Sequence, residues 1–280
     1  MSGIFGVVSR EDCAELLMYG TDYHSHMGTE YGGMAVLGEK FHRQIHNISH
    51  SQFKSKFFED AAKMKGTRGI GVISDSNEQP MYLNSRFGPF CIVTSGLIEN
   101  AEALAGELME KGVSFSEMSS TSINITELVA KIICTGKDLI DGINEVFERI
   151  EGSCSMLILN SDGVYAARDR SGYTSLVVGK KEGAWAVTSE TSAFPNNGFE
   201  TVKYLGPGEI VLINEKGMAT QKKSGDREQV CSFLWIYTGF PASSYEGINS
   251  ETVRERCGKA LAKRDSDIKA DLVSGIPDSG

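Results

Sequence analysis

The chain has 280 residues, of which 40% are hydrophobic and 23% charged, and its formal net charge is −9 at pH 7. An acidic chain without a lysine or arginine cluster is a poor partner for nucleic acids and for anionic membranes, so we expect neither. No apolar run reaches the roughly 18 residues of a membrane span, and no signal peptide is recognisable, which predicts a cytoplasmic protein. The length suffices for one large domain and part of a second.

Hydrophobic periodicity and turn residues predict alternating strands and helices in the first half of the chain. Strands are expected at residues 3–8, 31–37, 39–46, 69–74, 80–84 and 90–94. Helices are expected at residues 13–19, 51–64, 101–111, 122–134 and 138–150. Asn100 is a suitable N-cap and Gly112 a suitable C-cap for the third helix, and Gly88-Pro89 predicts a turn between the last two strands.

The second half is predicted to be mainly strands. A hairpin of residues 153–160 and 164–168 is expected to turn at Asp162-Gly163. Further strands are expected at residues 175–179, 184–188, 201–205, 209–213 and 217–222. After a polar linker we expect a strand at 232–237, a helix at 250–263 and the start of a strand at 271–274. Because helices cluster in the middle and strands at both ends, the pattern favours an α+β fold with two antiparallel sheet layers between helices.

The cysteines and histidines form no clear ligand set. The six cysteines include no C-x-x-C pair, and in a chain of this size we expect free, mostly buried thiols. His42, His46 and His50 are four residues apart, a spacing that would place metal ligands on one face of a helix. This segment is typical of a strand instead, so we favour non-metal roles for the three side chains.

The N-terminal Met1-Ser2-Gly3 suggests a nucleophile at the chain end. A small residue after Met1 permits removal of the initiator, which would leave Ser2 with a free α-amine beside its hydroxyl. The pKa of such an amine is about 8, so nucleophile and base would share one residue. Because Met-Ser-Gly is a short motif, it indicates no chemistry without further context.

Several segments together resemble the N-terminal part of the amidophosphoribosyltransferases, a family of purine biosynthesis. They lie at residues 3–6, 26–30, 33–36, 96–102, 164–173, 188–193, 206–210, 245–248 and 276–280. The resemblance implies a four-layer αββα sandwich of the N-terminal-nucleophile (Ntn) hydrolase class. It implies a class II glutamine amidotransferase-like domain over residues 1–224. Residues 225–280 would then form a linker and the start of a phosphoribosyltransferase-type α/β domain.

The resemblance also identifies the positions of the glutaminase machinery, and the nucleophile and the oxyanion hole both depart from the family. Ser2 stands where the family has a cysteine nucleophile, and a hydroxyl ionises far less readily than a thiol. Ser95-Gly96 stands where the family has the Asn-Gly of the oxyanion hole, so one side-chain donor is shortened or lost. These substitutions predict weakened or absent glutamine hydrolysis.

The positions that would hold glutamine depart as well. Ile125, followed by Thr126, stands where the family has an aspartate for the α-amine, and an apolar side chain cannot pair with an ammonium group. Val72 and Ile73 lie in the segment that replaces the family's His-x-Arg-Tyr-Ser-Thr, whose arginine grips the α-carboxylate. Met27 replaces an arginine. We therefore name Ile125, Thr126, Val72 and Ile73 as degenerate glutamine-clamp positions.

Cofactors and partners are implied only by the resemblance. Cys231 falls where one subgroup places a ligand of a [4Fe–4S] cluster, although a lone cysteine is more often a core residue. The other ligands, and a magnesium ion with the phosphoribosyltransferase domain, would lie beyond residue 280. Family members associate as dimers or tetramers, so we expect a homo-oligomer that binds glutamine or a replacement small molecule.

Three functional hypotheses stay open. In the first, the domain has lost glutaminase activity and acts as a scaffold or regulator of the homologue. In the second, it is an active amidotransferase that supplies ammonia for phosphoribosylamine synthesis, with Ser2 substituted for the cysteine. In the third, the old pocket binds a different small molecule. Four simultaneous departures favour the first and third over the second.

Overall fold

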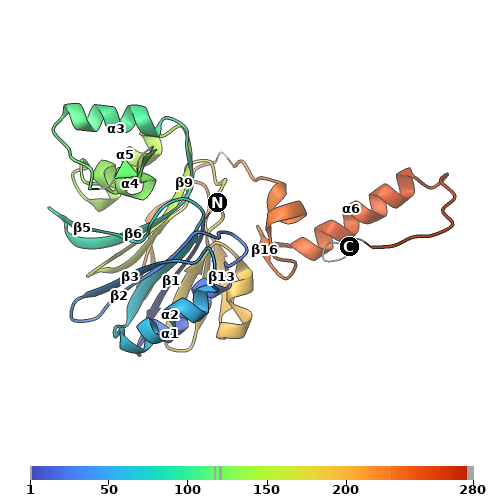
Figure 1. Cartoon of the computed structure of the whole chain (residues 1–280), viewed down its shortest axis with the longest axis horizontal. Coiled ribbons are helices and arrows are strands. Elements are labelled where there is room, and N and C mark those ends of the chain that lie inside the picture. Colours follow the sequence, from blue (N-terminus) through green and yellow to red (C-terminus); the bar gives the residue numbers. More distant parts are fainter. Residues whose placement is uncertain (1, 117, 120–121, 227, 276–280) are drawn as a thin grey trace.

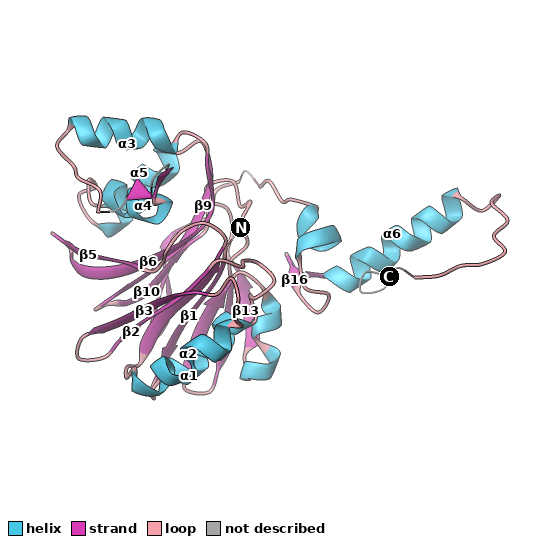
Figure 2. Cartoon of the chain, in the orientation of Figure 1, coloured by secondary structure: helices cyan, strands magenta, loops and turns pink. Residues whose placement is uncertain are grey.

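The computed structural model describes residues 2–116, 118–119, 122–226 and 228–275. Two antiparallel sheets lie face to face, with helices on both outer sides (Figures 1 and 2). The predicted α+β, four-layer αββα fold is therefore confirmed. None of the described helices is both long and apolar enough to span a membrane.

The first sheet has seven strands in the order β13-β11-β12-β1-β4-β2-β3. Its strands are β1 (Gly3–Ser9), β2 (Tyr31–Leu37), β3 (Phe41–Asn47), β4 (Arg68–Ser74), β11 (Val177–Lys181), β12 (Ala184–Thr188) and β13 (Glu200–Tyr204). The second sheet has six strands in the order β15-β14-β10-β9-β6-β5. Its strands are β5 (Met81–Ser85), β6 (Gly88–Ile98), β9 (Gly152–Asn160), β10 (Gly163–Ala167), β14 (Ile210–Asn214) and β15 (Gly217–Lys222).

The helices divide between the two outer faces. Helices α1 (Ala14–Asp22) and α2 (Phe53–Lys63) cover the first sheet, while α3 (Ala101–Glu110), α4 (Ile125–Ile133) and α5 (Leu139–Arg149) cover the second. Short pairs join β7 (Met118–Ser119) to β8 (Ser122–Ile123) and β16 (Ser244–Tyr245) to β17 (Ile248–Asn249). Helix α6 (Ser250–Arg264) projects away from the sheets in Figure 1.

Strand β1 lies at the centre of the first sheet, between β12 and β4. Its side chains alternate between two cores, as the two-residue period of a strand requires. Phe5 and Val7 pack beneath α1 and α2, whereas Ile4 and Val8 pack between the sheets. Because the side chains of β1 are buried on both faces of the sheet, Ser2, the residue before this strand, is held in a fixed position.

Three local predictions were wrong. Residues 232–237 do not form a strand but lead into a π-helix at Leu234–Thr238, because a short apolar run does not distinguish strand from helix. Residues 271–275 form no strand, and the side chains of Leu272 and Val273 are largely exposed, since no neighbouring strand is there to pair with them. Gly88-Pro89 begins β6 rather than forming the turn, because Ser85 already pairs with Gly88.

All six cysteines are free thiols, as expected. Burial raises the pKa of Cys13, Cys91 and Cys154 to about 12, which keeps these three unreactive near neutral pH. His46 lies on β3, as predicted, and its Nε2 is 2.6 Å from Asp60 Oδ2. No group of three or more His, Cys, Asp or Glu in the described part of the chain is placed to hold a metal ion. The domain boundary after residue 224 stays a prediction.

Candidate functional site

Ser2 lies immediately before β1, and its side chain meets the end of the neighbouring strand. Because Gly3 pairs with Ile73, the residue that follows Ile73 comes beside Ser2. That residue is Ser74, and Ser2 Oγ donates a hydrogen bond to Ser74 Oγ over 3.1 Å. Ser2 is 8% exposed and Ser74 is 1% exposed, so two neutral hydroxyls form a nearly buried pair.

Ser95 and Gly96 approach Ser2 from the second sheet, on β6. Ser95 Oγ donates a hydrogen bond to the carbonyl oxygen of Ser2 over 2.5 Å. Gly96 has a φ of +153°, and a Cβ there would lie 2.1 Å from Ser153 O, so only glycine fits. The structure thus brings Ser2 and Ser95 together, and Gly96 is the next residue of β6.

Thr126 also reaches β6, through its hydroxyl. Its Oγ1 lies 2.7 Å from Thr94 Oγ1, and both side chains are buried. Ile125 begins α4, and its backbone N–H donates to Asn77 Oδ1 over 3.2 Å. Asn124 caps this helix by accepting hydrogen bonds from the backbone of the first turn. Ile125, the predicted amine-clamp position, is therefore an apolar residue at a helix start whose first turn also contains Glu127.

Val72 and Ile73 are placed differently from the other predicted site residues. Val72 packs between the two sheets, and Ile73 packs under the helices of the first sheet. Ser74, which follows them, is the member of this segment that contacts Ser2. A strand places successive side chains on opposite faces, so an alignment error of one residue along β4 changes which side chain is assigned to the site.

A buried polar network beside β1 was not predicted from the sequence. His24 is fully buried, and its Nε2 lies 2.9 Å from Thr188 Oγ1. It packs so tightly against Gly3 that a Cβ there would lie 2.3 Å from His24 Cβ. Burial lowers the pKa of His24 to about 4, although the nearby Glu190 carboxylate opposes this. His24 is therefore neutral at pH 7.

Glu190 is the acidic centre of this network. Its carboxylate lies 3.1 Å from His26 Nε2, and it accepts hydrogen bonds from Ser243 Oγ and from the Tyr245 hydroxyl. Burial opposes ionisation, but the bonds from His26 and Tyr245 outweigh it and hold the pKa of Glu190 below its usual value. Because Ser243 and Tyr245 follow the linker, this carboxylate fastens the later segment to the sandwich.

The motif at residues 168–173 has a structural role. The Arg168 guanidinium is fully buried; it donates to the Leu205 and Gly172 carbonyls and forms an ion pair of 2.7 Å with Glu246. Asp169 accepts hydrogen bonds from the backbone N–H groups of residues 171, 173 and 174. Arg168 and Asp169 therefore fix a loop, whereas the exposed Arg170 pairs with Glu148 over 3.2 Å.

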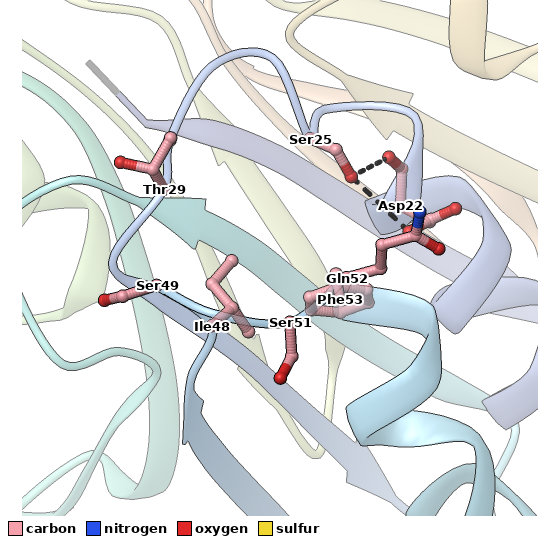
Figure 3. Close-up of a pocket in the computed structure, with 9 residues that line it drawn as sticks. Asp22, Ser25, Thr29, Ile48, Ser49, Ser51, Gln52 and Phe53 are labelled. Atoms are coloured by element: carbon pink, nitrogen blue, oxygen red, sulfur yellow. Dashed lines mark hydrogen bonds between the residues drawn. The ribbon is translucent and has the colours of Figure 1, made fainter.

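Two hollows adjoin this region. The smaller has a volume of about 240 Å³ and is lined by Met27 and Ser95 together with Ser175, Cys231 and Tyr245, among others. The larger hollow has a volume of about 500 Å³ and is lined in part by the loop that precedes α2 (Figure 3). Its side chains, drawn in Figure 3, are Asp22, Ser25, Thr29, Ile48, Ser49, Ser51, Gln52 and Phe53.

Cys231 supplies one thiol to the smaller hollow, next to Tyr173. A [4Fe–4S] cluster needs four such ligands. Within the described residues Cys231 belongs to no group of three or more His, Cys, Asp or Glu side chains that could hold a metal. These residues do not by themselves fit a cluster, which stays a prediction that depends on further chain. Residues 276–280, the last segment of the family resemblance, lie outside the described residues.

Comparison with known proteins identifies homologues of this chain. A family model described as a glutamine amidotransferase domain matches residues 67–196. The amidophosphoribosyltransferase of Methanocaldococcus jannaschii is 31% identical over 308 aligned positions, which cover 100% of this chain and 64% of the relative. The chain is a homologue of the amidophosphoribosyltransferases. The Bacillus subtilis amidophosphoribosyltransferase is 30% identical over 99% of this chain and 59% of its own length.

Solved structures of this family agree with the fold. A glutamine phosphoribosylpyrophosphate amidotransferase from Bacillus subtilis, complexed with ADP and GMP, superposes with a TM-score of 0.88 at 29% identity. The match covers 99% of this chain and 61% of the other. A structure described as the allosteric regulatory enzyme of purine biosynthesis gives a TM-score of 0.89. The chain thus spans about three fifths of the amidophosphoribosyltransferases it matches.

Proposed function

We propose that this chain is the glutamine amidotransferase-like part of an amidophosphoribosyltransferase homologue that has lost glutamine hydrolysis. In this proposal it acts as a scaffold, a regulator or a ligand-binding domain. The observation that carries the proposal is the hydrogen bond from Ser95 Oγ to the carbonyl oxygen of Ser2. A donor engaged inside the fold is not free to stabilise a developing oxyanion, and losing one such donor costs about a hundredfold or more in rate.

The surroundings of Ser2 also support lost hydrolysis. A serine nucleophile needs a base and a setting that favours the alkoxide. Once Met1 is removed, the α-amine of Ser2 could supply the base. The partner of its hydroxyl is Ser74 Oγ, a neutral group that does not stabilise an alkoxide as a cation would.

The clamp positions support the same conclusion. Glutamine carries an ammonium and a carboxylate group, and each needs a charged or hydrogen-bonding partner when it leaves water. Ile125 at the amine position and Ser74 beside Ser2 supply no charge. Met27, at the other departed position, lines the smaller hollow with a thioether. Glutamine would therefore bind weakly.

The second candidate is an active amidotransferase that supplies ammonia for phosphoribosylamine synthesis. The position of Ser2 favours it, because the residue stands before the central strand and contacts Ser95, which is followed by Gly96 in a backbone conformation that favours glycine. In either case, we propose that residues 225–280 begin a phosphoribosyltransferase-type domain and that the whole protein is a homo-oligomer. A magnesium ion would belong to that second domain.

The test is ammonia release from glutamine by a Ser2→Cys variant, with calorimetric titration of glutamine in parallel. Mass spectrometry of the intact variant first verifies that Met1 has been removed, and Ser2→Ala serves as the matched control. Ammonia release above that of Ser2→Ala would refute lost hydrolysis and support the second candidate. We expect neither ammonia nor binding heat from the processed variant.

A further inference from the structure

The smaller hollow has a buried floor and an aromatic rim. Ser95, Ser175 and Ser189 are each 3% exposed, whereas Tyr173 is 44% and Phe233 58% exposed. All five residues line the same cavity of about 240 Å³. It lies between the end of β6 and the segment that follows the linker, so residues from distant parts of the chain enclose it.

The lining carries no charged side chain within the described residues; it consists of hydroxyls, one thiol, a thioether and apolar groups. Burial, together with the nearby Glu190 carboxylate, raises the pKa of Tyr245. A hydrogen bond with Cys231 raises the pKa of Tyr173. Both phenols are therefore uncharged at neutral pH, and the wall of the cavity is neutral.

Most hydroxyls of the floor are already engaged in the fold. Ser95 Oγ donates to the Ser2 carbonyl, Ser189 Oγ accepts from the Ile4 backbone N–H over 3.0 Å, and the Tyr245 hydroxyl donates to Glu190. Ser175 Oγ differs, because it is buried and has no hydrogen-bond partner among the described residues. A buried hydroxyl without a partner destabilises the fold, and a hydrogen bond from a ligand or water would offset this cost.

We propose that this cavity binds a small, uncharged molecule with an apolar body and one hydrogen-bonding group that pairs with Ser175. The inference deepens the ligand-binding part of the proposed function and rests on it. Rotation of the serine hydroxyl among its staggered positions allows it to meet a donor or an acceptor. The cavity is smaller than the roughly 300–1,000 Å³ of drug-sized sites, so the ligand is small.

The uncharged lining of the smaller hollow determines which ligands it can bind. A carboxylate or ammonium group placed in this cavity would lose water and find no opposite charge. A free amino acid is therefore excluded, whereas an aromatic or aliphatic alcohol keeps its hydrogen bond and buries its apolar surface. Met27 and Leu234 supply apolar contacts for the body of such a ligand.

The experiment is calorimetric titration of residues 1–280 with 2-naphthol and with 2-naphthoate, which share a ring system and differ in charge. We expect one naphthol site per chain and at least about tenfold weaker binding of naphthoate. Ser175→Leu, which fills the cavity, should weaken naphthol binding at least about tenfold. Ser51→Leu, in the larger hollow, is the matched control and should leave it unchanged.

Phe233→Ala provides a second variant, because this exposed rim residue can be truncated without opening the core; it should weaken binding about threefold or more. Absence of saturable naphthol binding, or equal binding of naphthoate, would overturn the proposal. Unchanged naphthol affinity in the folded Ser175→Leu variant would also overturn the proposal. If Ser175→Leu does not fold, unchanged affinity in Phe233→Ala would overturn it. The naphthol titration contains no glutamine, so a negative result in it does not bear on the proposed loss of glutamine hydrolysis. Conversely, ammonia release by Ser2→Cys would refute the loss of hydrolysis but not the naphthol site.

Discussion

Two serines near the same loop should respond in opposite ways to replacement by alanine. Ser155 Oγ accepts a hydrogen bond from Asp169 N over 2.9 Å and donates one to Thr174 O over 3.0 Å. Ser155→Ala leaves this N–H and this carbonyl buried without partners, which should lower the free energy of unfolding by about 2–4 kcal/mol. Ser175→Ala removes a hydroxyl without a partner, so it should be neutral or stabilise the protein by about 1 kcal/mol.

Urea denaturation of both variants, followed by circular dichroism, checks this contrast. The two substitutions remove the same atom, so their difference isolates the hydrogen bonds rather than the volume lost. We expect the transition midpoints to move in opposite directions with unchanged slopes. Equal losses of stability at Ser155 and Ser175 would refute the reasoning, because they would mean that Ser175 Oγ is as well paired in solution as Ser155 Oγ.

Three further predictions concern stability. Gly96→Ala should cost more than about 3 kcal/mol in urea denaturation, because its Cβ would collide with Ser153 O; a variant of wild-type stability would contradict the strained geometry. The pKa of His24 is near 4 in the folded protein, below its value in the unfolded chain. The free energy of unfolding should therefore fall by up to about 3 kcal/mol as the pH drops from 6.5 to 4. His24→Gln should remove this pH dependence from urea midpoints measured across that range. The lowered pKa of Glu190 adds its own loss only below about pH 4.5. Asn124→Ala should cost about 1 kcal/mol through loss of the α4 cap, and an unshifted thermal midpoint would argue against that cap.

The strands and helices that build the layers of the fold were predictable because the sequence patterns that indicate them are local. The strand expected at residues 217–222, which is β15, and the Asp162-Gly163 turn before β10 depend on neighbours in sequence, and both were placed correctly. The apolar run at residues 232–237 was assigned to the wrong element, since its length suits either a strand or a helical turn. Local patterns thus determine the elements, except where short apolar runs are ambiguous.

The candidate site was predictable only where a motif named its members. Ser2 and Ser95 were placed together because the family resemblance assigns both to one site. Ser74 was missed because a one-residue shift along β4 decides which side chain reaches Ser2. His24 contacts Thr188 across 164 positions of sequence, and no local pattern predicts such a pairing.

The proposed loss of the clamps and the neutrality of the smaller hollow would have one physical origin. A site for a zwitterion needs fixed charges, and each fixed charge needs its own partners when the site is empty. In the proposed function, Ile125 stands in place of an anion and Val72 and Ile73 in place of a cation, so that requirement disappears, and hydroxyls that pair within the fold suffice. A neutral cavity of this kind stabilises the unliganded fold and selects uncharged ligands by the same energetics. Restoring a cysteine at position 2 alone would therefore not restore affinity for glutamine.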